Sequence, residues 1–138
     1  MPERAGEGDG EEELRAGAER SVRTDQPGYV TKTVALPRLN GLSPTLESTA
    51  LKLMEEAGEL GRAIGKYRGL SGEKPLPEPE ALRCVALELL DVAQTAITMM
   101  FVLEENHAVD IDDALRQHME KLVERGYLRD PSPRGTCS

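Results

Sequence analysis

A run of twenty residues from Cys84 to Leu103 is the feature that most constrains the fold. Apart from Cys84, its only ionisable side chains are Glu88 and Asp91. An apolar run of this length is long enough to span a membrane. Two carboxylates in the middle of a span would, however, cost about 2.5–3.5 kcal/mol each. The run therefore predicts a helix of a protein without membrane contact, covered on most sides by neighbouring helices.

Two further helices are predicted on either side of this run. The first is expected to begin with Ser43 as its N-cap and Pro44 in the first helical position, and to stop at Gly69. Apolar residues recur along it at steps of three and four, which indicates one buried face: Leu46, Ala50, Leu53, Ala57, Leu60, Ile64 and Tyr67.

The central helix should start near Pro79, after a proline-rich loop over 69–80, and run to about Glu105. The last helix should be capped by Asp110 and end at Gly126. These segments predict an all-α fold, an antiparallel helical bundle of three to four main helices. We expect oligomerisation to complete the bundle, because a nearly all-round apolar central helix leaves surface uncovered.

Half of the net charge of −8 lies in residues 1–27, about a fifth of the chain. Residues 1–27 contain four basic and eight acidic side chains, and their only large apolar residues are Met1, Leu14 and Val22. Such a segment predicts a disordered acidic tail. Residues 28–43 then form an extended arm or one short strand, 44–128 the helical domain, and 129–138 a flexible C-terminal tail.

Net charge limits the classes of partner that the chain can bind, and cysteine content indicates the cellular compartment. An acidic balance disfavours binding to nucleic-acid polymers and to anionic membrane surfaces. Two cysteines, Cys84 and Cys137, and an N-terminus without an apolar signal segment favour a reducing, cytoplasmic location. We expect Cys84 to be a small buried hydrophobic residue.

Two pairs of carboxylates mark the candidate site. Glu56 and Glu59 are three residues apart on the first helix, and Glu88 and Asp91 are three apart on the central one. Residues at this spacing are neighbours on a helix surface, so antiparallel packing can bring the pairs together. Oxygen ligands without nearby His or Cys favour a hard ion, Mg²⁺ or Mn²⁺.

Each pair also has a structural interpretation. The first pair is compatible with a solvated helix face, since Glu is a good helix former. The second is compatible with a buried salt bridge, for which the chain offers three basic partners: Arg62, Lys66 and Lys121.

The segments LKLMEEAGELGRAIGKYRG, LELLDVAQTAITMM and DALRQHMEKLVERGYL resemble the MazG-like, all-α nucleoside triphosphate pyrophosphohydrolases over roughly residues 44–128. That family's motif, E-x-x-E followed by E-x-x-D, reads here Glu56 to Glu59 and Glu88 to Asp91. The resemblance implies a helical bundle working as a homodimer or homotetramer. It implies a Mg²⁺ ion, for which Mn²⁺ is the alternative, held by these four carboxylates.

The resemblance also implies the reaction, hydrolysis of a nucleoside triphosphate to the monophosphate and pyrophosphate for house-cleaning or nucleotide-pool control. Glu56 or Glu59 would act as the general base. Lys121 and Arg125 match the family's phosphate-binding basic residues, with surface charge as the alternative, and Lys52 would contact phosphate or pair with Glu56.

Two departures from the family pattern leave the substrate open. The chain has no tryptophan to offer a base pocket, and Leu87 stands where relatives often have a second Glu before Glu88. The competing interpretations are a catalytically silent nucleotide-binding or regulatory helical module, and a helical interaction protein.

Overall fold

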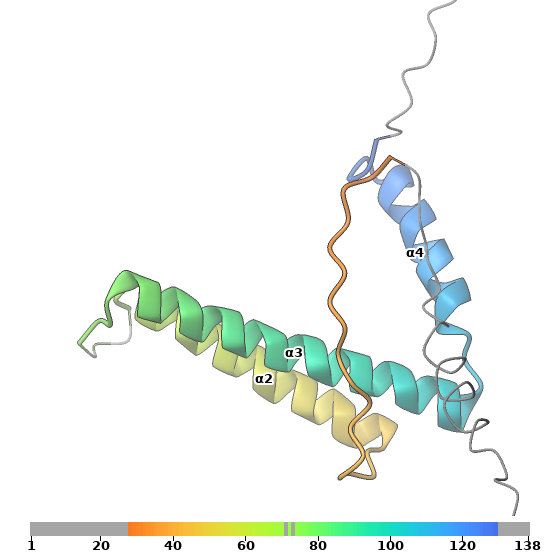
Figure 1. Ribbon diagram of the computed structural model, residues 1–138, viewed down its shortest axis with the longest axis horizontal. Coiled ribbons are helices and arrows are strands. Elements are labelled where there is room, and N and C mark those ends of the chain that lie inside the picture. The colour runs from red at the N-terminus through yellow and green to blue at the C-terminus, as the bar shows by residue number, and fades with distance from the viewer. Residues whose placement is uncertain (1–27, 71, 73, 130–138) are drawn as a thin grey trace, which may run out of the picture. The chain divides into compact units, whose positions relative to one another are not determined.

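The computed structural model describes residues 28–70, 72 and 74–129. One compact unit of the chain, Lys32–Arg129, contains the three described helices. These are α2 (Leu46–Tyr67), α3 (Glu78–His107) and α4 (Ile111–Glu124) (Figure 1). Between residues 28 and 129 the described chain forms no strand, which confirms the all-α prediction. The predicted acidic tail and nearly all of the C-terminal tail lie outside the described residues.

The start of α2 corrects the sequence prediction by two residues. The N-cap is Thr45, whose hydroxyl accepts from the Ser48 backbone N–H at 3.1 Å. The Ser48 hydroxyl in turn accepts from the Thr45 N–H at 2.9 Å. This reciprocal capping box satisfies two N–H groups together. That double satisfaction explains why the helix starts after Thr45 rather than after Ser43.

Glycines end two of the helices, as predicted. Gly69 follows α2 with φ +72° and Gly126 follows α4 with φ +76°. At the first, the Gly69 N–H donates to the Lys66 carbonyl and the Leu70 N–H to the Gly65 carbonyl. This is the Schellman pattern, which needs a residue in the left-handed region.

The other predicted boundaries hold closely. Pro79 lies in the first turn of α3, which continues two residues beyond the predicted Glu105. Ala108 then takes a left-handed conformation, with φ +52°. Asp110 caps α4 by accepting from the Asp113 backbone N–H at 2.9 Å.

The pairing of α2 with α3 is the main packing contact of the described chain, and it is antiparallel (Figure 1). Ala63 and Ala81 line one cavity near the connecting loop, whereas Thr49 and Thr95 line another at the opposite end of α2. The buried residues follow this seam: Thr49 and Ala63 from α2, and Ala81, Thr95, Thr98 and Val102 from α3. By comparison, α4 contacts α3 sparingly.

The other faces of α3 are not covered within one chain, contrary to the predicted burial on most sides. Leu87 and Leu89 are 54% and 53% exposed, and Cys84 is exposed rather than buried. By length and composition alone α3 is able to cross a membrane, and 17% of its most apolar stretch is buried. Self-association, which would cover this surface, stays a prediction.

The chain before α2 crosses α3 as an extended arm, residues 32–45 (Figure 1). The Gln94 side-chain amide donates to the Pro37 carbonyl at 2.9 Å. Arg38 makes two parallel bonds to the Glu105 carboxylate, from Nε at 2.6 Å and from Nη2 at 2.8 Å. These contacts fasten the arm to the C-terminal half of α3.

Candidate metal centre

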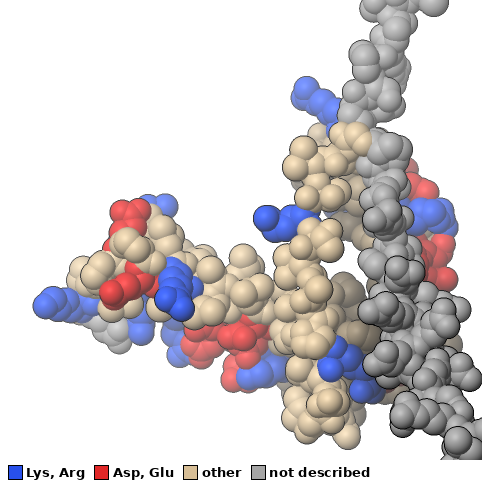
Figure 2. Space-filling model, viewed as in Figure 1, with Lys and Arg blue, Asp and Glu red and all other residues tan. Residues whose placement is uncertain are grey.

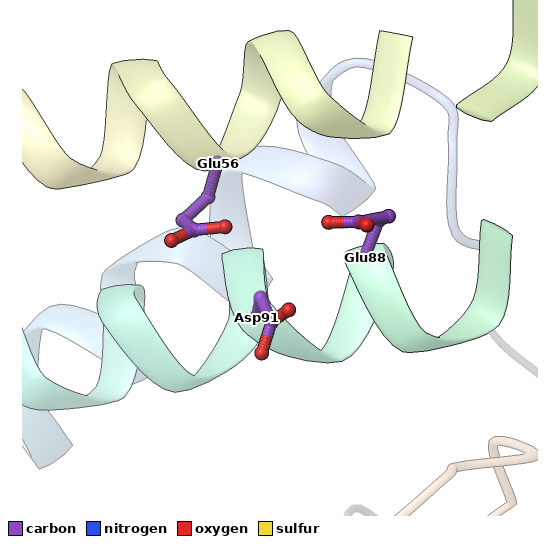
Figure 3. Close-up of side chains that lie close together, drawn as sticks. All are labelled: Glu56, Glu88 and Asp91. Atoms are coloured by element: carbon purple, nitrogen blue, oxygen red, sulfur yellow. The ribbon is translucent and has the colours of Figure 1, made fainter. Parts of the chain in front are cut away.

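Three of the four predicted carboxylates converge at the middle of the helical hairpin. Glu56 extends from α2, and Glu88 and Asp91 extend from neighbouring turns of α3 (Figure 3). Each offers one oxygen, and the three oxygens lie within 4.8 Å of one another. The i,i+3 spacing on α3 and the antiparallel register against α2 together produce this convergence.

The donor set fits a hard divalent cation. Ligands on opposite sides of Mg²⁺ are about 4.1 Å apart, twice the usual 2.0–2.1 Å bond. Small side-chain rotations would therefore bring the three oxygens to one ion. The Glu56 side chain is 12% exposed whereas Asp91 is exposed, so the centre is open to water on one side. This suits Mg²⁺, which keeps several water ligands.

Lys52 supplies the nearest positive charge. Its Nζ lies 2.6 Å from a Glu56 oxygen and 3.3 Å from a Glu55 oxygen. Hydrogen bonds to Glu56 first, and then to Glu55, raise the pKa of Lys52 above its usual value. Of the two predicted roles for Lys52, the structure therefore contains the ion pair with Glu56.

Glu59, the fourth predicted ligand, does not join the group of three. Its carboxylate pairs with Arg62, three residues further along α2. It nevertheless lines the same cavity as Glu88. The structure therefore places Glu59 beside the candidate centre and leaves its carboxylate outside the set of converging oxygens.

Two cavities flank the converging carboxylates. The first, of about 420 Å³, has Glu56 and Asp91 in its wall, and we call it the arm cavity because residues of the arm line it. The other lining residues are largely apolar or hydroxyl-bearing: Leu39, Leu42, Ser43, Pro44, Ser48, Thr49, Lys52, Gln94, Thr95 and Thr98.

The second cavity, of about 350 Å³, lies toward the α2–α3 loop and has Glu88 and Glu59 in its wall. We call it the basic cavity, because Arg62 and Lys66 also line it. In the space-filling view, acidic atoms gather midway along the hairpin and basic atoms lie on both sides of them (Figure 2).

Lys121 and Arg125, the predicted phosphate ligands, are not brought to this centre within the described chain. Lys121 lies in the last turn of α4 and Arg125 is its C-cap. Neither lines the arm cavity or the basic cavity. Arg62 and Lys66, by contrast, do line the basic cavity, although the sequence pattern indicates them only as ion-pair partners of the second carboxylate pair. Their spacing from Glu59, three and seven residues, was the signal that they share its side of α2.

Comparison with known proteins gives a matching family model and one similar protein. The model, described as the MazG nucleotide pyrophosphohydrolase domain, matches residues 44–127, which is more than half of the chain. A Bacillus subtilis (strain 168) protein described as the uncharacterized protein YvdC is 32% identical over 73 residues, covering 53% of this chain and 68% of that protein. No solved structure matches the chain.

Proposed function

The chain belongs to the MazG nucleotide pyrophosphohydrolase family, and on that premise we propose that it hydrolyses a nucleoside triphosphate to the monophosphate and pyrophosphate, using Mg²⁺ or Mn²⁺. One observation carries the proposal. Glu56, Glu88 and Asp91, which belong to both halves of the family motif, converge within 4.8 Å across two helices. A buried salt bridge, the structural interpretation of the second pair, would instead require a basic partner at Glu88 or Asp91.

The three converging carboxylates would hold the ion. When bound, a divalent ion neutralises phosphate charge, polarises the attacked phosphorus and lowers the pKa of a bound water. These carboxylates and the fixed hairpin would position the phosphate chain at the mouth of both cavities. No covalent nucleophile is required for this reaction, because water attacks the phosphorus.

Glu59 is the residue that we assign as general base. It lies in the same cavity as Glu88 but outside the group of three, so its Oε2, which does not bond to Arg62, is available to accept a proton from water. Its pairing with Arg62 fixes the orientation of the carboxylate. Glu56, the other predicted base, belongs to the converging group and is better placed to bind the ion.

Lys121 and Arg125 stay predicted phosphate ligands. Since they lie at the far end of α4 and outside both cavities, they would have to reach a carboxylate centre from a second copy of the chain. This makes the predicted homodimer or homotetramer a requirement of that role.

The experiment that tests the proposal is release of pyrophosphate from a panel of nucleoside triphosphates, with and without Mg²⁺. Loss of a metal ligand removes several kcal/mol of transition-state stabilisation, so Glu88→Gln and Asp91→Asn should each lower turnover about 100-fold or more. Glu104→Gln is the matched control, because Glu104 is an exposed carboxylate on the same helix.

The outcomes separate the three classes of function. Unchanged turnover in Glu88→Gln and Asp91→Asn would show that the metal assignment is wrong. Binding of Mg²⁺ and nucleotide without hydrolysis would identify a catalytically silent nucleotide-binding or regulatory module. If neither turnover nor binding occurs, the chain is a helical interaction protein.

A further inference from the structure

We propose that the two cavities divide the substrate between them: the arm cavity holds the nucleoside, and the basic cavity holds the two outer phosphates through Arg62 and Lys66. This inference rests on the proposed function and adds to it the direction in which the nucleotide lies. It also names the residues that contact each end. The arm becomes part of the nucleoside site, and α2 itself supplies two ligands of the outer phosphates, in addition to the predicted Lys121 and Arg125 of a second copy.

The position of the carboxylates between the two cavities is the first observation. Glu56 and Asp91 line the arm cavity, whereas Glu88 lines the basic cavity. All three nevertheless reach within 4.8 Å of one another. A ligand whose phosphate is held at this group therefore has one cavity open to it on each side.

The arm cavity has the chemistry of a site for an uncharged group. Leu39, Leu42 and Pro44 provide aliphatic surface. The Thr95 hydroxyl donates to the Asp91 carbonyl at 2.9 Å, and the Thr98 hydroxyl donates to the Gln94 carbonyl at 2.8 Å. With their protons committed, these threonines offer a ligand methyl groups and acceptor lone pairs.

Charge and size favour a nucleoside there over phosphate. Lys52 is the only basic residue in the described lining of the arm cavity, and it is already paired with Glu56 and Glu55. A volume of about 420 Å³ lies within the range of small-molecule sites, which are mostly apolar with a few polar groups. Thr98 Oγ1 already accepts one bond, from Gln94 Nε2 at 3.5 Å. The acceptors that remain, the other threonine lone pairs and the side-chain amide oxygen of Gln94, would select N–H groups on a base edge.

The basic cavity has the opposite character. Arg62 and Lys66 are four residues apart on α2, so they lie on neighbouring turns and both line the cavity. Arg62 already bonds to Glu59. A guanidinium has five N–H donors, however, so Arg62 can keep Glu59 and still donate to phosphate. The second acid in this cavity, Glu88, belongs to the candidate metal centre, where a bound cation would offset its charge.

The bidentate pair between Arg38 and Glu105 makes Arg38 a positioning residue. It fixes the arm on α3 one residue before Leu39, the first arm side chain in the cavity wall. The Gln94 bond to the Pro37 carbonyl fixes the residue before it. The two contacts together determine where the aliphatic wall stands relative to Thr95 and Thr98.

The test measures binding of three ligands to the full chain in Mg²⁺: a non-hydrolysable α,β-methylene nucleoside triphosphate, inorganic tripolyphosphate, and a nucleoside monophosphate. Leu42→Asn should weaken the analogue and the monophosphate about tenfold and leave tripolyphosphate unchanged. Val34→Asn is its control, because Val34 belongs to the same arm, is 52% exposed and does not line the arm cavity.

Arg62→Gln and Lys66→Gln should show the reverse pattern. Each should weaken the analogue and tripolyphosphate about tenfold and leave the monophosphate unchanged, because only ligands with outer phosphates reach the basic cavity. Arg83→Gln is the control, since Arg83 is an exposed arginine outside that cavity. The swapped pair Arg38→Glu with Glu105→Arg should restore the analogue affinity that Arg38→Glu alone lowers. If the wild type hydrolyses a triphosphate, Arg38→Glu should raise KM and leave kcat unchanged, and the swapped pair should restore KM.

The proposal is overturned if Leu42→Asn affects all three ligands equally or none, or if Arg62→Gln and Lys66→Gln leave tripolyphosphate binding unchanged. It is also overturned if the wild-type chain binds none of the three. A further outcome is that the wild type hydrolyses no triphosphate while Leu42→Asn weakens only the analogue and the monophosphate, and Arg62→Gln and Lys66→Gln weaken only the analogue and tripolyphosphate. That result would support the division of the two cavities and reject only the proposed hydrolysis. Circular dichroism of each variant verifies that the helices are intact.

Discussion

Glu88→Gln should have opposite effects on stability with and without Mg²⁺. The Glu88 and Asp91 carboxylates lie within 4.8 Å of one another, and Glu56 is offset by Lys52. Two like charges at 4.8 Å repel by about 0.9 kcal/mol at the permittivity of water and about 3.5 kcal/mol at an effective value of 20. Asp91 is exposed and Glu88 half-buried, which favours the low end of this range.

Neutralising Glu88 should therefore raise the free energy of unfolding by about 1 kcal/mol in a chelator at low salt, which for a folded unit of this size is a rise in Tm of about 4–8 °C. In millimolar Mg²⁺ the order should reverse, because the wild type gains binding energy that the variant loses. Thermal unfolding followed by circular dichroism, in chelator and across a Mg²⁺ series, measures both effects.

Glu104→Gln, the exposed carboxylate on the same helix, should change stability by less than about 0.5 kcal/mol in either condition. Equal stabilisation of the wild type and Glu88→Gln by Mg²⁺ would refute the assignment of Glu88 as a ligand. If Glu88→Gln is less stable than the wild type in chelator, the repulsion between Glu88 and Asp91, from which the magnitude was calculated, is refuted.

Three other predictions concern the scaffold. Asp110→Ala should lower the free energy of unfolding by about 1 kcal/mol, measured by urea titration, because it removes the N-cap bond of α4. Hydrogen bonds from Arg116 and then Gln117 hold the pKa of Asp113 below its usual value. The stabilisation that the ionised Asp113 gives the fold is therefore present above the pKa of the unfolded chain, and it is lost as pH falls through the lower pKa of the folded chain. Asp113→Asn should accordingly be destabilising at pH 7 and neutral at strongly acidic pH, and an equal effect at both would contradict the ion pair. Leu89→Glu should convert a dimer or tetramer to a monomer in sedimentation velocity, and a wild-type monomer with intact helices would contradict self-association.

The helices and the pairing of Glu88 with Asp91 were predictable from local sequence, because they depend on spacing along one helix. Glu88 and Asp91 are three residues apart on one helix, so they share a face of α3. That face is the one that packs toward α2, which brings the two carboxylates to Glu56. Glu56 joins this pair only through the antiparallel packing of α2 on α3. The position of Glu59 was not predictable, since Arg62 at three residues' distance competes with the metal centre for its carboxylate. The N-cap of α2 was a choice between two hydroxyl residues on either side of Pro44, Ser43 and Thr45, and the capping box with Ser48 decides for Thr45.

The parts of the site that depend on distant contacts could not be read from the sequence. Arg38 and Glu105 are 67 residues apart, and nothing local to either indicates the other. The arm was therefore predicted as extended, but its place in a cavity wall was not. The burial of α3 was overestimated for the same reason, because apolar composition does not say whether cover comes from this chain or from another copy.

The identity of the products tests the central claim most directly. Phosphorus NMR of a nucleoside triphosphate incubated with the full chain and Mg²⁺ distinguishes cleavage between the α and β phosphates from cleavage between the β and γ phosphates. The account predicts monophosphate and pyrophosphate in equal amounts, and no products in chelator. Formation of diphosphate and inorganic phosphate, or the same products at the same rate in chelator, would contradict it.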